Sequence, residues 1–160
     1  MLTEALDSQG QIAMALLKPG FENNYFGSPA IHPVLSVGSI ITYEARDDGT
    51  YDVVLLGDKR ARLEREVGGK IYRRGVLGEL EEKTSGSRED RKNLRMDMEA
   101  LLEVAIQDMK KENKGLALLQ KSFAEESSFG FLVDFLAYHF IKSPESQQSL
   151  LEELDVSLRA

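Results

Sequence analysis

Apolar and polar residues alternate along the middle of the chain, as they do in half-buried β-strands. In the segment 39–45, Ile41, Tyr43 and Ala45 fall on one face and the residues between them on the other. The next residues, Asp47-Asp48-Gly49, tolerate the positive φ angles of a tight turn. A β-hairpin is therefore predicted at this turn.

Three more strands are predicted after the turn. Residues 51–56 form a run that is too apolar on both faces for an open sheet edge, and Gly57-Asp58 ends it. In the following strand, residues 60–66, one face carries two basic and two acidic side chains, namely Arg60, Arg62, Glu64 and Glu66. We expect that face to be solvated, because burying unpaired charge is costly. After Gly68-Gly69, residues 72–80 form the fourth strand. Successive antiparallel strands twist, so this region is expected to curl into a small barrel.

The residues before this region predict a short helical segment, a strand and a long loop. Residues 1–7 look like the last turns of a helix, and residues 11–17 form an apolar run of strand length. The loop of residues 21–35 contains several large apolar side chains, among them Tyr25, Phe26 and Ile31. Such side chains either pack against the barrel or contact a partner. We favour packing, because exposed aromatic groups are costly on a monomer.

The composition becomes polar at residues 83–87, and every element predicted beyond them is helical. This change divides the chain into a β-rich part, residues 1–83, and a helical part, residues 84–160. Ser87 is a suitable N-cap for the first helix, whose first turn carries acidic residues that the helix dipole favours. The predicted apolar stripe of this helix consists of Leu94, Met98, Leu101, Leu102, Ala105 and Met109.

Further helices are predicted from caps and from apolar spacing. A short one includes Leu116, Leu119 and Phe123. Ser127 or Ser128 begins the most hydrophobic one. Ser143-Pro144-Glu145 combines an N-cap, a first-turn proline and an early acid, and Asp155 is placed to cap a last turn.

The composition is that of an ordinary globular protein. Of the 160 residues, 42% are hydrophobic and 29% are charged, the net charge is −7, and cysteine is absent. The negative charge argues against a dedicated nucleic-acid-binding protein, because phosphate contacts dominate such affinity. No apolar run approaches the roughly 20 residues of a membrane span, so we expect no membrane association and a cytoplasmic location.

Candidate catalytic and metal-binding residues are few. Gly68-Gly69-Lys70 lacks the earlier glycine and the following Ser or Thr of a phosphate-binding loop, so we interpret it as a hairpin turn. His32 and His139 would need carboxylates from distant segments to bind zinc. We interpret them as a backbone-anchored loop residue and a hydrogen-bonded helix residue. The sequence therefore predicts no catalytic, cofactor or metal site.

Several short motifs occur in an order that resembles a known family. They are Val37-Gly38-Ser39, Asp48-Gly49, the run from Leu56-Gly57-Asp58 to Arg62, and a C-terminal segment, residues 131–159, with Gln147-Gln148 and Asp155. Together they resemble the N-terminal domain of the Lon ATP-dependent protease family, over nearly the whole chain. The resemblance implies an α+β fold in which a PUA-like β pseudo-barrel is followed by a C-terminal helical bundle.

The resemblance also implies a function. Such domains recognise protein substrates without performing chemistry, so the chain is expected to bind unfolded or tagged polypeptide segments, alone or as an adaptor for a separate protease. Tyr25, Phe26 and Ile31 are the candidate peptide-binding residues.

Family members usually begin with a further apolar strand that is not seen before residue 1. We interpret this as a start assigned at an internal methionine; the alternative is completion of the barrel by another chain. Either leaves an unpaired strand edge through which a homo-oligomer is expected to form.

An RNA-binding function is the alternative, because PUA-like barrels also occur in RNA-binding proteins. Basic residues crowd the third and fourth predicted strands: Lys59, Arg60, Arg62, Arg65, Lys70, Arg73 and Arg74. Asp58, Glu64 and Glu66 lie among them, which indicates a salt-bridged surface rather than a phosphate track. Aromatic residues for base stacking are scarce there. We therefore favour protein binding over RNA binding, and rank an enzyme of another kind last.

Overall fold

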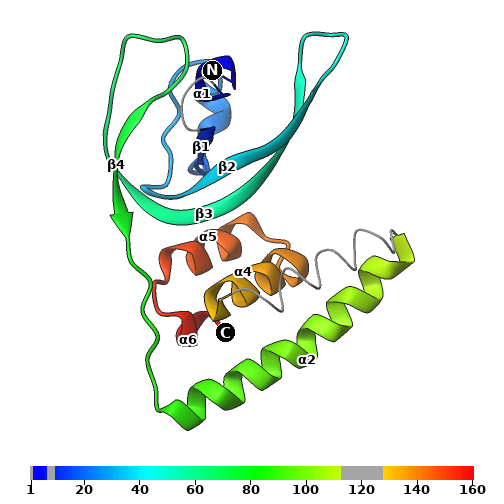
Figure 1. Cartoon of the computed structure of the whole chain (residues 1–160). Helices are drawn as coiled ribbons and strands as arrows, with labels where there is room; N and C mark the ends of the chain where they lie inside the picture. Colours follow the sequence, from blue (N-terminus) through cyan, green and yellow to red (C-terminus); the bar gives the residue numbers. More distant parts are fainter. Residues whose placement is uncertain (1, 7–9, 113–127) are drawn as a thin grey trace. The chain divides into compact units, whose positions relative to one another are not determined.

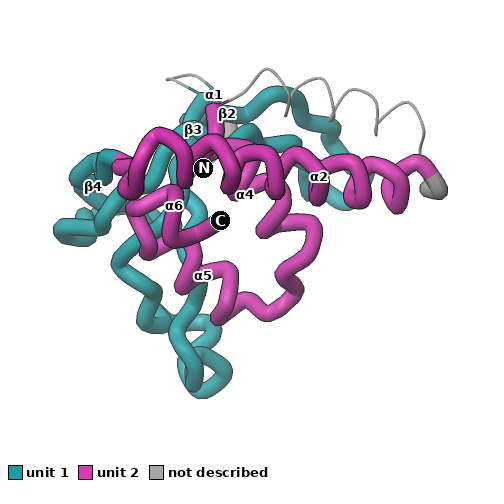
Figure 2. Tube along the Cα trace, turned by 90° about the horizontal axis from the view of Figure 1, so that it is seen from below, with its two compact units in different colours: residues 1–81 teal, residues 82–160 magenta. Residues whose placement is uncertain are grey.

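The computed structural model describes residues 2–6, 10–112 and 128–160. The chain forms two compact units, Met1–Glu81 and Glu82–Ala160, which have different colours in Figure 2. We describe each unit by itself. The sequence predicted the boundary two residues further on, after residue 83, and the division into a β-rich and a helical subdomain at that residue stays a prediction.

The first unit is built on an antiparallel sheet of four strands in the order β1-β2-β3-β4 (Figure 1). Its elements are α1 (Leu2–Leu6), β1 (Gln11–Met14), the 3-10 turn η1 (Phe21–Asn24), β2 (Val34–Ala45), β3 (Tyr51–Glu66) and β4 (Gly75–Leu80). The helical start, the early strand and the hairpin at Gly49 are confirmed; Gly49 has a φ of 82°. The first long strand begins earlier than predicted, since residues 34 and 35 pair with β3 rather than belonging to the loop.

The prediction that Gly57-Asp58 separates two strands is wrong. Both residues lie inside β3, which runs for 16 residues. Val37 pairs with Lys59 and Gly38 pairs with Gly57, so Asp58 is an extra residue in a β-bulge. A bulge bends a strand without ending it, and that explains why a turn-like pair of residues does not break the sheet here.

Gly38 makes this bulge possible because the two backbones approach closely there. A Cβ atom at Gly38 would lie 2.8 Å from the carbonyl oxygen of Leu56, whereas a Cβ at Gly57 would meet nothing within 4 Å. Neither glycine has a positive φ. The two positions are direct partners across the strands and differ only in the space available.

We therefore expect Gly38→Ala to lower the free energy of unfolding by about 1–3 kcal/mol, because β2 and β3 must separate to admit the methyl group. Gly57→Ala is the matched control and should be neutral or slightly stabilising, since alanine restricts the unfolded chain. Urea unfolding of both variants measures the difference. Equal destabilisation by both substitutions would contradict the close approach at Gly38.

Two predictions about exposure in the central strands are also wrong. Arg60 is only 8% exposed, although the face to which it was assigned was expected to be solvated. At this position β3 has a strand on each side, with Ser36 and Leu80 as the partners of Arg60, so Arg60 lies in the middle of the sheet rather than at an edge. Conversely, residues 51–56 were expected to be covered, yet they pair with β2 alone among the described strands, and Val54 is exposed.

Three contacts join the segments that flank the two edge strands of the sheet. Glu4 in α1 accepts hydrogen bonds from the Lys70 ammonium group, at 2.7 Å, and from the Tyr72 hydroxyl group. The Arg73 guanidinium group donates to the Pro29 carbonyl oxygen at 2.6 Å. Residues 70–73 precede β4, whereas Glu4 and Pro29 lie on either side of β1. The curved sheet of Figure 1 thereby has its two ends linked by side chains.

The second unit contains the helices α2 (Arg88–Glu112), α4 (Phe129–Phe140), α5 (Pro144–Glu152) and α6 (Val156–Arg159). The predicted caps are confirmed. The hydroxyl oxygens of Ser87, Ser128 and Ser143 accept hydrogen bonds from backbone N–H groups in the first turns of α2, α4 and α5. Asp155 does the same for α6. The predicted helix around residues 116–123 lies outside the described residues.

The core of this unit forms between α2, α4 and α6. Its buried members are Met98, Leu102, Ala105, Ile106, Leu132, Val133, Leu136 and Val156. The predicted stripe of α2 is wrong at Leu101, which is exposed, and it omits Ile106, which is fully buried. The buried stripe follows positions 98, 102, 105, 106 and 109, and Leu101 lies about 100° around the helix from Leu102, outside it.

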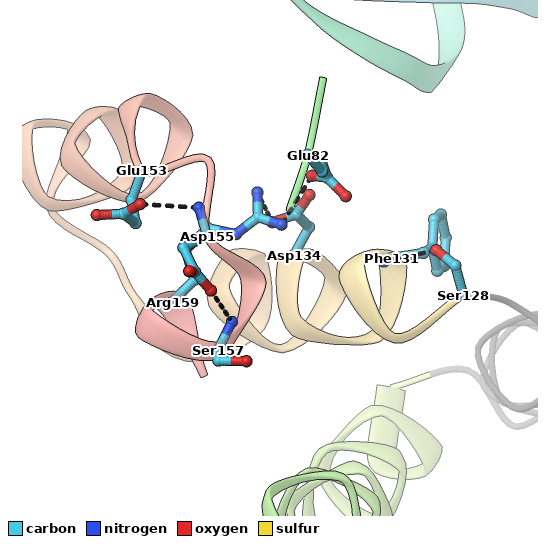
Figure 3. Close-up of polar contacts among 8 residues, drawn as sticks. All are labelled: Glu82, Ser128, Phe131, Asp134, Glu153, Asp155, Ser157 and Arg159. Carbon is cyan, nitrogen blue, oxygen red and sulfur yellow. Dashed lines mark hydrogen bonds and ion pairs between the residues drawn. The ribbon is translucent and has the colours of Figure 1, made fainter. Parts of the chain in front are cut away.

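A buried cation links the first residue of this unit, Glu82, to its penultimate residue, Arg159. The Arg159 side chain is 0% exposed; its guanidinium group lies 2.7 Å from Glu82 and 3.4 Å from Asp134 (Figure 3). Gly130 permits this arrangement, because a methyl group there would collide with the Glu82 carboxylate. We call Arg159, Glu82 and Asp134 the Arg159 cluster.

Candidate functional site

The loop between β1 and β2 carries the predicted binding residues, and backbone pairing holds its base. Lys18 N–H donates to the Ala30 carbonyl at 2.8 Å, and His32 N–H donates to the Leu16 carbonyl at 2.9 Å. Between these bonds, Leu17 and Ile31 form an isolated antiparallel bridge. The two ends of the loop are thus fixed side by side.

The local sequence explains how the loop turns. Gly20 has a φ of 87°, a conformation that favours glycine, and it leads into η1. The turn continues until Gly27 N–H donates to the Asn24 carbonyl at 2.9 Å. A Cβ atom at Gly27 would meet the Asn24 side chain, which would have to move to admit it.

The aromatic side chains of the loop stack against one another but not into the core. The rings of Tyr25 and Phe26 lie edge to face with their centroids 5.4 Å apart, and Phe21 lies 6.2 Å from Tyr25. Tyr25 is 59% exposed and Phe26 is 100% exposed. The expectation that these two side chains pack against the sheet is therefore wrong.

Ile31, the third predicted residue, has a different position. It is half-buried in the base of the loop, opposite Leu17. The structure thus brings Tyr25 and Phe26 together at the surface and leaves Ile31 below them on the same loop. Phe21 completes the aromatic group, and sequence analysis missed it as a candidate. Its spacing of four residues from Tyr25 was the available signal. We call Phe21, Tyr25 and Phe26 the loop aromatics.

Three of the seven basic residues in β3 and in the connection to β4 are paired with acids. Lys59 binds Glu79 at 2.9 Å, Lys70 binds Glu4 at 2.7 Å, and Arg73 binds Glu66. The hydrogen bond from Arg73 holds the pKa of Glu66 below its usual value, and the bond from Lys70 does the same for the pKa of Glu4. With Arg60 buried as well, this surface has the salt-bridged character predicted for it, which does not favour binding to phosphates.

The other candidate sites hold no group of residues suited to catalysis or metal binding. Gly69, in the supposed phosphate loop, has a φ of 95° and lies in the connection between β3 and β4. Among the described residues, no cluster of His, Asp and Glu could hold a metal ion. A shallow hollow of about 310 Å³ lies beside the start of α2, but the carboxylate of Asp90 in it is engaged with Ser87 at the helix cap.

Comparison with known proteins assigns this chain to a family. A family model described as the ATP-dependent protease La (LON) substrate-binding domain matches residues 1–160. The chain belongs to this family. The match accounts for all 160 residues, so none of them is left for an ATPase or protease domain, and the family domain itself is non-catalytic. No curated protein matched the sequence of the chain.

Two solved structures share the fold. The N-terminal domain of the Lon protease of the Mycobacterium avium complex has a TM-score of 0.58 at 15% identity, with coverage of 93% of this chain and 84% of the other. The Lon N-terminal domain protein of Xanthomonas campestris has a TM-score of 0.52 at 16% identity, with coverage of 94% and 86%. At such identities the likeness concerns the fold, an antiparallel four-stranded sheet with helices. No described helix is long and apolar enough to cross a bilayer.

Proposed function

We propose that this substrate-recognition module binds extended apolar segments of unfolded or tagged polypeptides through the loop aromatics. The observation that carries the proposal is the complete exposure of Phe26 on a loop whose base is fixed by backbone pairing. An exposed phenylalanine is costly for a soluble protein and gains stability when a partner covers it. Membership in a substrate-binding family supports the same interpretation.

The arrangement of the loop suits repeated binding of different sequences. Edge-to-face contact with Tyr25 restricts the Phe26 ring before a partner arrives, so less side-chain entropy is lost on binding. Ile31 lies at the base of the loop, where a bound apolar side chain reaches it. Aromatic contacts of this kind depend on apolar area more than on a particular sequence, as a substrate-recognition module requires.

The wider form of the proposal concerns the fold and the partners. We infer a PUA-like pseudo-barrel, with the contacts from Glu4 and Arg73 closing the sheet, and a helical bundle beside it in sequence. The strand β1 lies at an edge of the described sheet and offers its backbone to an added strand. A second copy of the chain or a bound polypeptide would pair there, and a separate protease would receive the bound substrate.

Phe26→Ser is the sharpest test. We expect it to weaken binding of reduced and carboxymethylated lactalbumin about tenfold, because the contact of one large apolar side chain is lost. The measurement is fluorescence anisotropy of the labelled unfolded protein. Stability should not change, since the Phe26 side chain is fully exposed.

Tyr138→Ser is the matched control. Tyr138 is an exposed aromatic residue of the second unit, and its replacement should leave affinity unchanged. Wild-type affinity in the Phe26 variant would contradict the proposed surface. Absence of any binding by the wild-type chain, together with salt-sensitive binding to RNA that Arg73→Glu with Arg74→Glu abolishes, would replace the proposal with the RNA-binding alternative.

A further inference from the structure

The hairpin formed by β2 and β3 extends beyond the strands on either side of it. β1 pairs with residues 36–39 of β2, and β4 pairs with residues 60–66 of β3. Within the described part of the chain, residues 42–45 therefore pair only with residues 51–54. We call residues 41–56 the hairpin arm; its tip lies apart from β1 and β4 in Figure 1.

The hairpin arm is apolar where a two-stranded ribbon is expected to be polar. Four of its large side chains are between 48% and 59% exposed: Ile41, Tyr43, Tyr51 and Val54. The register places Tyr43 opposite Val53 and Ala45 opposite Tyr51, so Ile41, Tyr43 and Tyr51 lie on one face, whereas Val54, opposite Thr42, lies on the other. The two tyrosine rings lie 6.2 Å apart. A two-stranded ribbon is marginally stable alone, and this face is suited to covering by another segment.

The tip of the arm is acidic. Residues 44–52 contain four carboxylates and one cation: Glu44, Asp47, Asp48, Asp52 and Arg46. Arg46 binds Asp52 at 2.7 Å, and Asp48 accepts hydrogen bonds from Thr50 that hold its pKa below the usual value. Both acids support the turn. Glu44 and Asp47 are exposed, and Glu44, opposite Asp52, lies on the other face of the arm from Tyr43 and Tyr51.

We propose that the hairpin arm binds polypeptide segments in which aromatic or aliphatic residues alternate with Arg or Lys. In an extended segment lying along the arm, the apolar side chains would lie on the face of Tyr43 and Tyr51, and the alternate cations would lie on the face of Glu44, near the acidic tip. Charge complementarity selects this occupant, because acidic segments are repelled by the tip and two acidic tips repel each other. The inference rests on the proposed polypeptide-binding function and specifies its substrate class and a second contact surface.

Three labelled synthetic peptides test the proposal on the full chain. In the first, Phe and Leu alternate with Arg; in the second, Ser replaces every Arg; in the third, Glu replaces every Arg. The wild-type chain should bind the Arg peptide about tenfold more tightly than the Ser peptide, and the Glu peptide most weakly. Raising the salt concentration should reduce the preference for Arg, because exposed charges are screened.

Two pairs of substitutions separate the apolar and the charged contributions. Glu44→Gln with Asp47→Asn should lower affinity for the Arg peptide severalfold and leave the Ser peptide unaffected. Tyr43→Ser with Tyr51→Ser should weaken binding of both peptides. The controls are Glu81→Gln with Glu89→Gln, which removes the same charge from exposed positions elsewhere, and Tyr138→Ser. Both controls should bind as the wild type does.

The outcomes distinguish failure of this inference from failure of the proposed function. Arm variants that bind every peptide normally, while Phe26→Ser loses affinity, would overturn the inference and retain the function. A wild-type chain that binds neither peptides nor unfolded protein would overturn both. A dimer in sedimentation analysis that Tyr43→Ser with Tyr51→Ser dissociates would show that a second copy covers the arm, and would also overturn the inference. The Tyr43→Ser with Tyr51→Ser variant could fail to form the two-stranded ribbon. The Glu44→Gln with Asp47→Asn variant keeps both tyrosines and the turn, so comparing the hydrogen exchange of its residues 41–56 with and without the Arg peptide still tests whether the peptide binds the hairpin arm.

Discussion

Ile106→Ala is expected to lower the free energy of unfolding of the helical unit by about 3 kcal/mol. Ile106 is fully buried within a cluster that also contains Leu102 and Leu132. Truncation removes apolar contacts and leaves a cavity that the packed helices fill only in part. Urea unfolding followed by the helical circular dichroism signal is the measurement. The described helices longer than five residues all lie in this unit, and the chain has no tryptophan for a fluorescence assay.

Val104→Ala is the matched control for this experiment. Val104 is on the same helix, is also β-branched, and is exposed. Its replacement should change the free energy of unfolding by less than about 0.5 kcal/mol, because alanine is the better helix former and little buried area is lost. Equal effects at both positions would mean that the assignment of the buried face of α2 is wrong.

Helix starts were predictable from the sequence because capping is local chemistry. The hydroxyl oxygen of a serine, or the carboxylate oxygen of an aspartate, accepts a hydrogen bond from the backbone N–H group two or three residues later. The residues that define a helix start therefore lie within one turn of each other. Ser87, Ser128, Ser143 and Asp155 all act as predicted. The hairpin at Gly49 was predictable for the same reason.

Features that depend on partners far along the chain were not predictable. Gly57-Asp58 has the composition of a turn, and only the close approach of Gly38 in β2 makes it a bulge in a continuous strand. Arg60 is buried in the middle of the sheet, although its own strand has the alternating pattern of a solvated charged face. Neither the partner nor the register of a strand is contained in its own residues.

The candidate site was predictable in its residues but not in its geometry. The number of apolar side chains between residues 21 and 35 indicated either packing or binding, and the sequence could not decide between them. The structure shows that the pairing of residues 16–18 with 30–32 closes the loop and that Phe26 is exposed, while binding by these residues stays a proposal. The hairpin arm was missed because residues 51–56 have the composition of a covered strand.

The second large effect on stability is expected in the Arg159 cluster. Its size depends on whether the cation or the two carboxylates are removed. Arg159 is fully buried and keeps its charge at all accessible pH values, whereas Glu82 and Asp134 have side chains 35% and 39% exposed. Glu82→Gln with Asp134→Asn leaves a buried cation without an anion, which should lower the free energy of unfolding by about 3–5 kcal/mol.

Arg159→Met should cost less, about 1–2 kcal/mol, because methionine fills much of the space and water solvates the two carboxylates that remain. Two further variants complete the experiment. The triple variant, which combines Arg159→Met with Glu82→Gln and Asp134→Asn, should be more stable than the carboxylate double variant, because it removes the buried cation that the double variant leaves unpaired. Arg95→Met, which breaks the exposed pair with Glu99, should cost less than about 0.5 kcal/mol. If Arg159→Met proved more destabilising than the double variant, the guanidinium group would be stabilised by its packing rather than by these anions. The two effects differ because the Arg159 guanidinium group is buried and depends on the carboxylates for stabilisation, whereas water can stabilise the partly exposed carboxylates when the cation is absent.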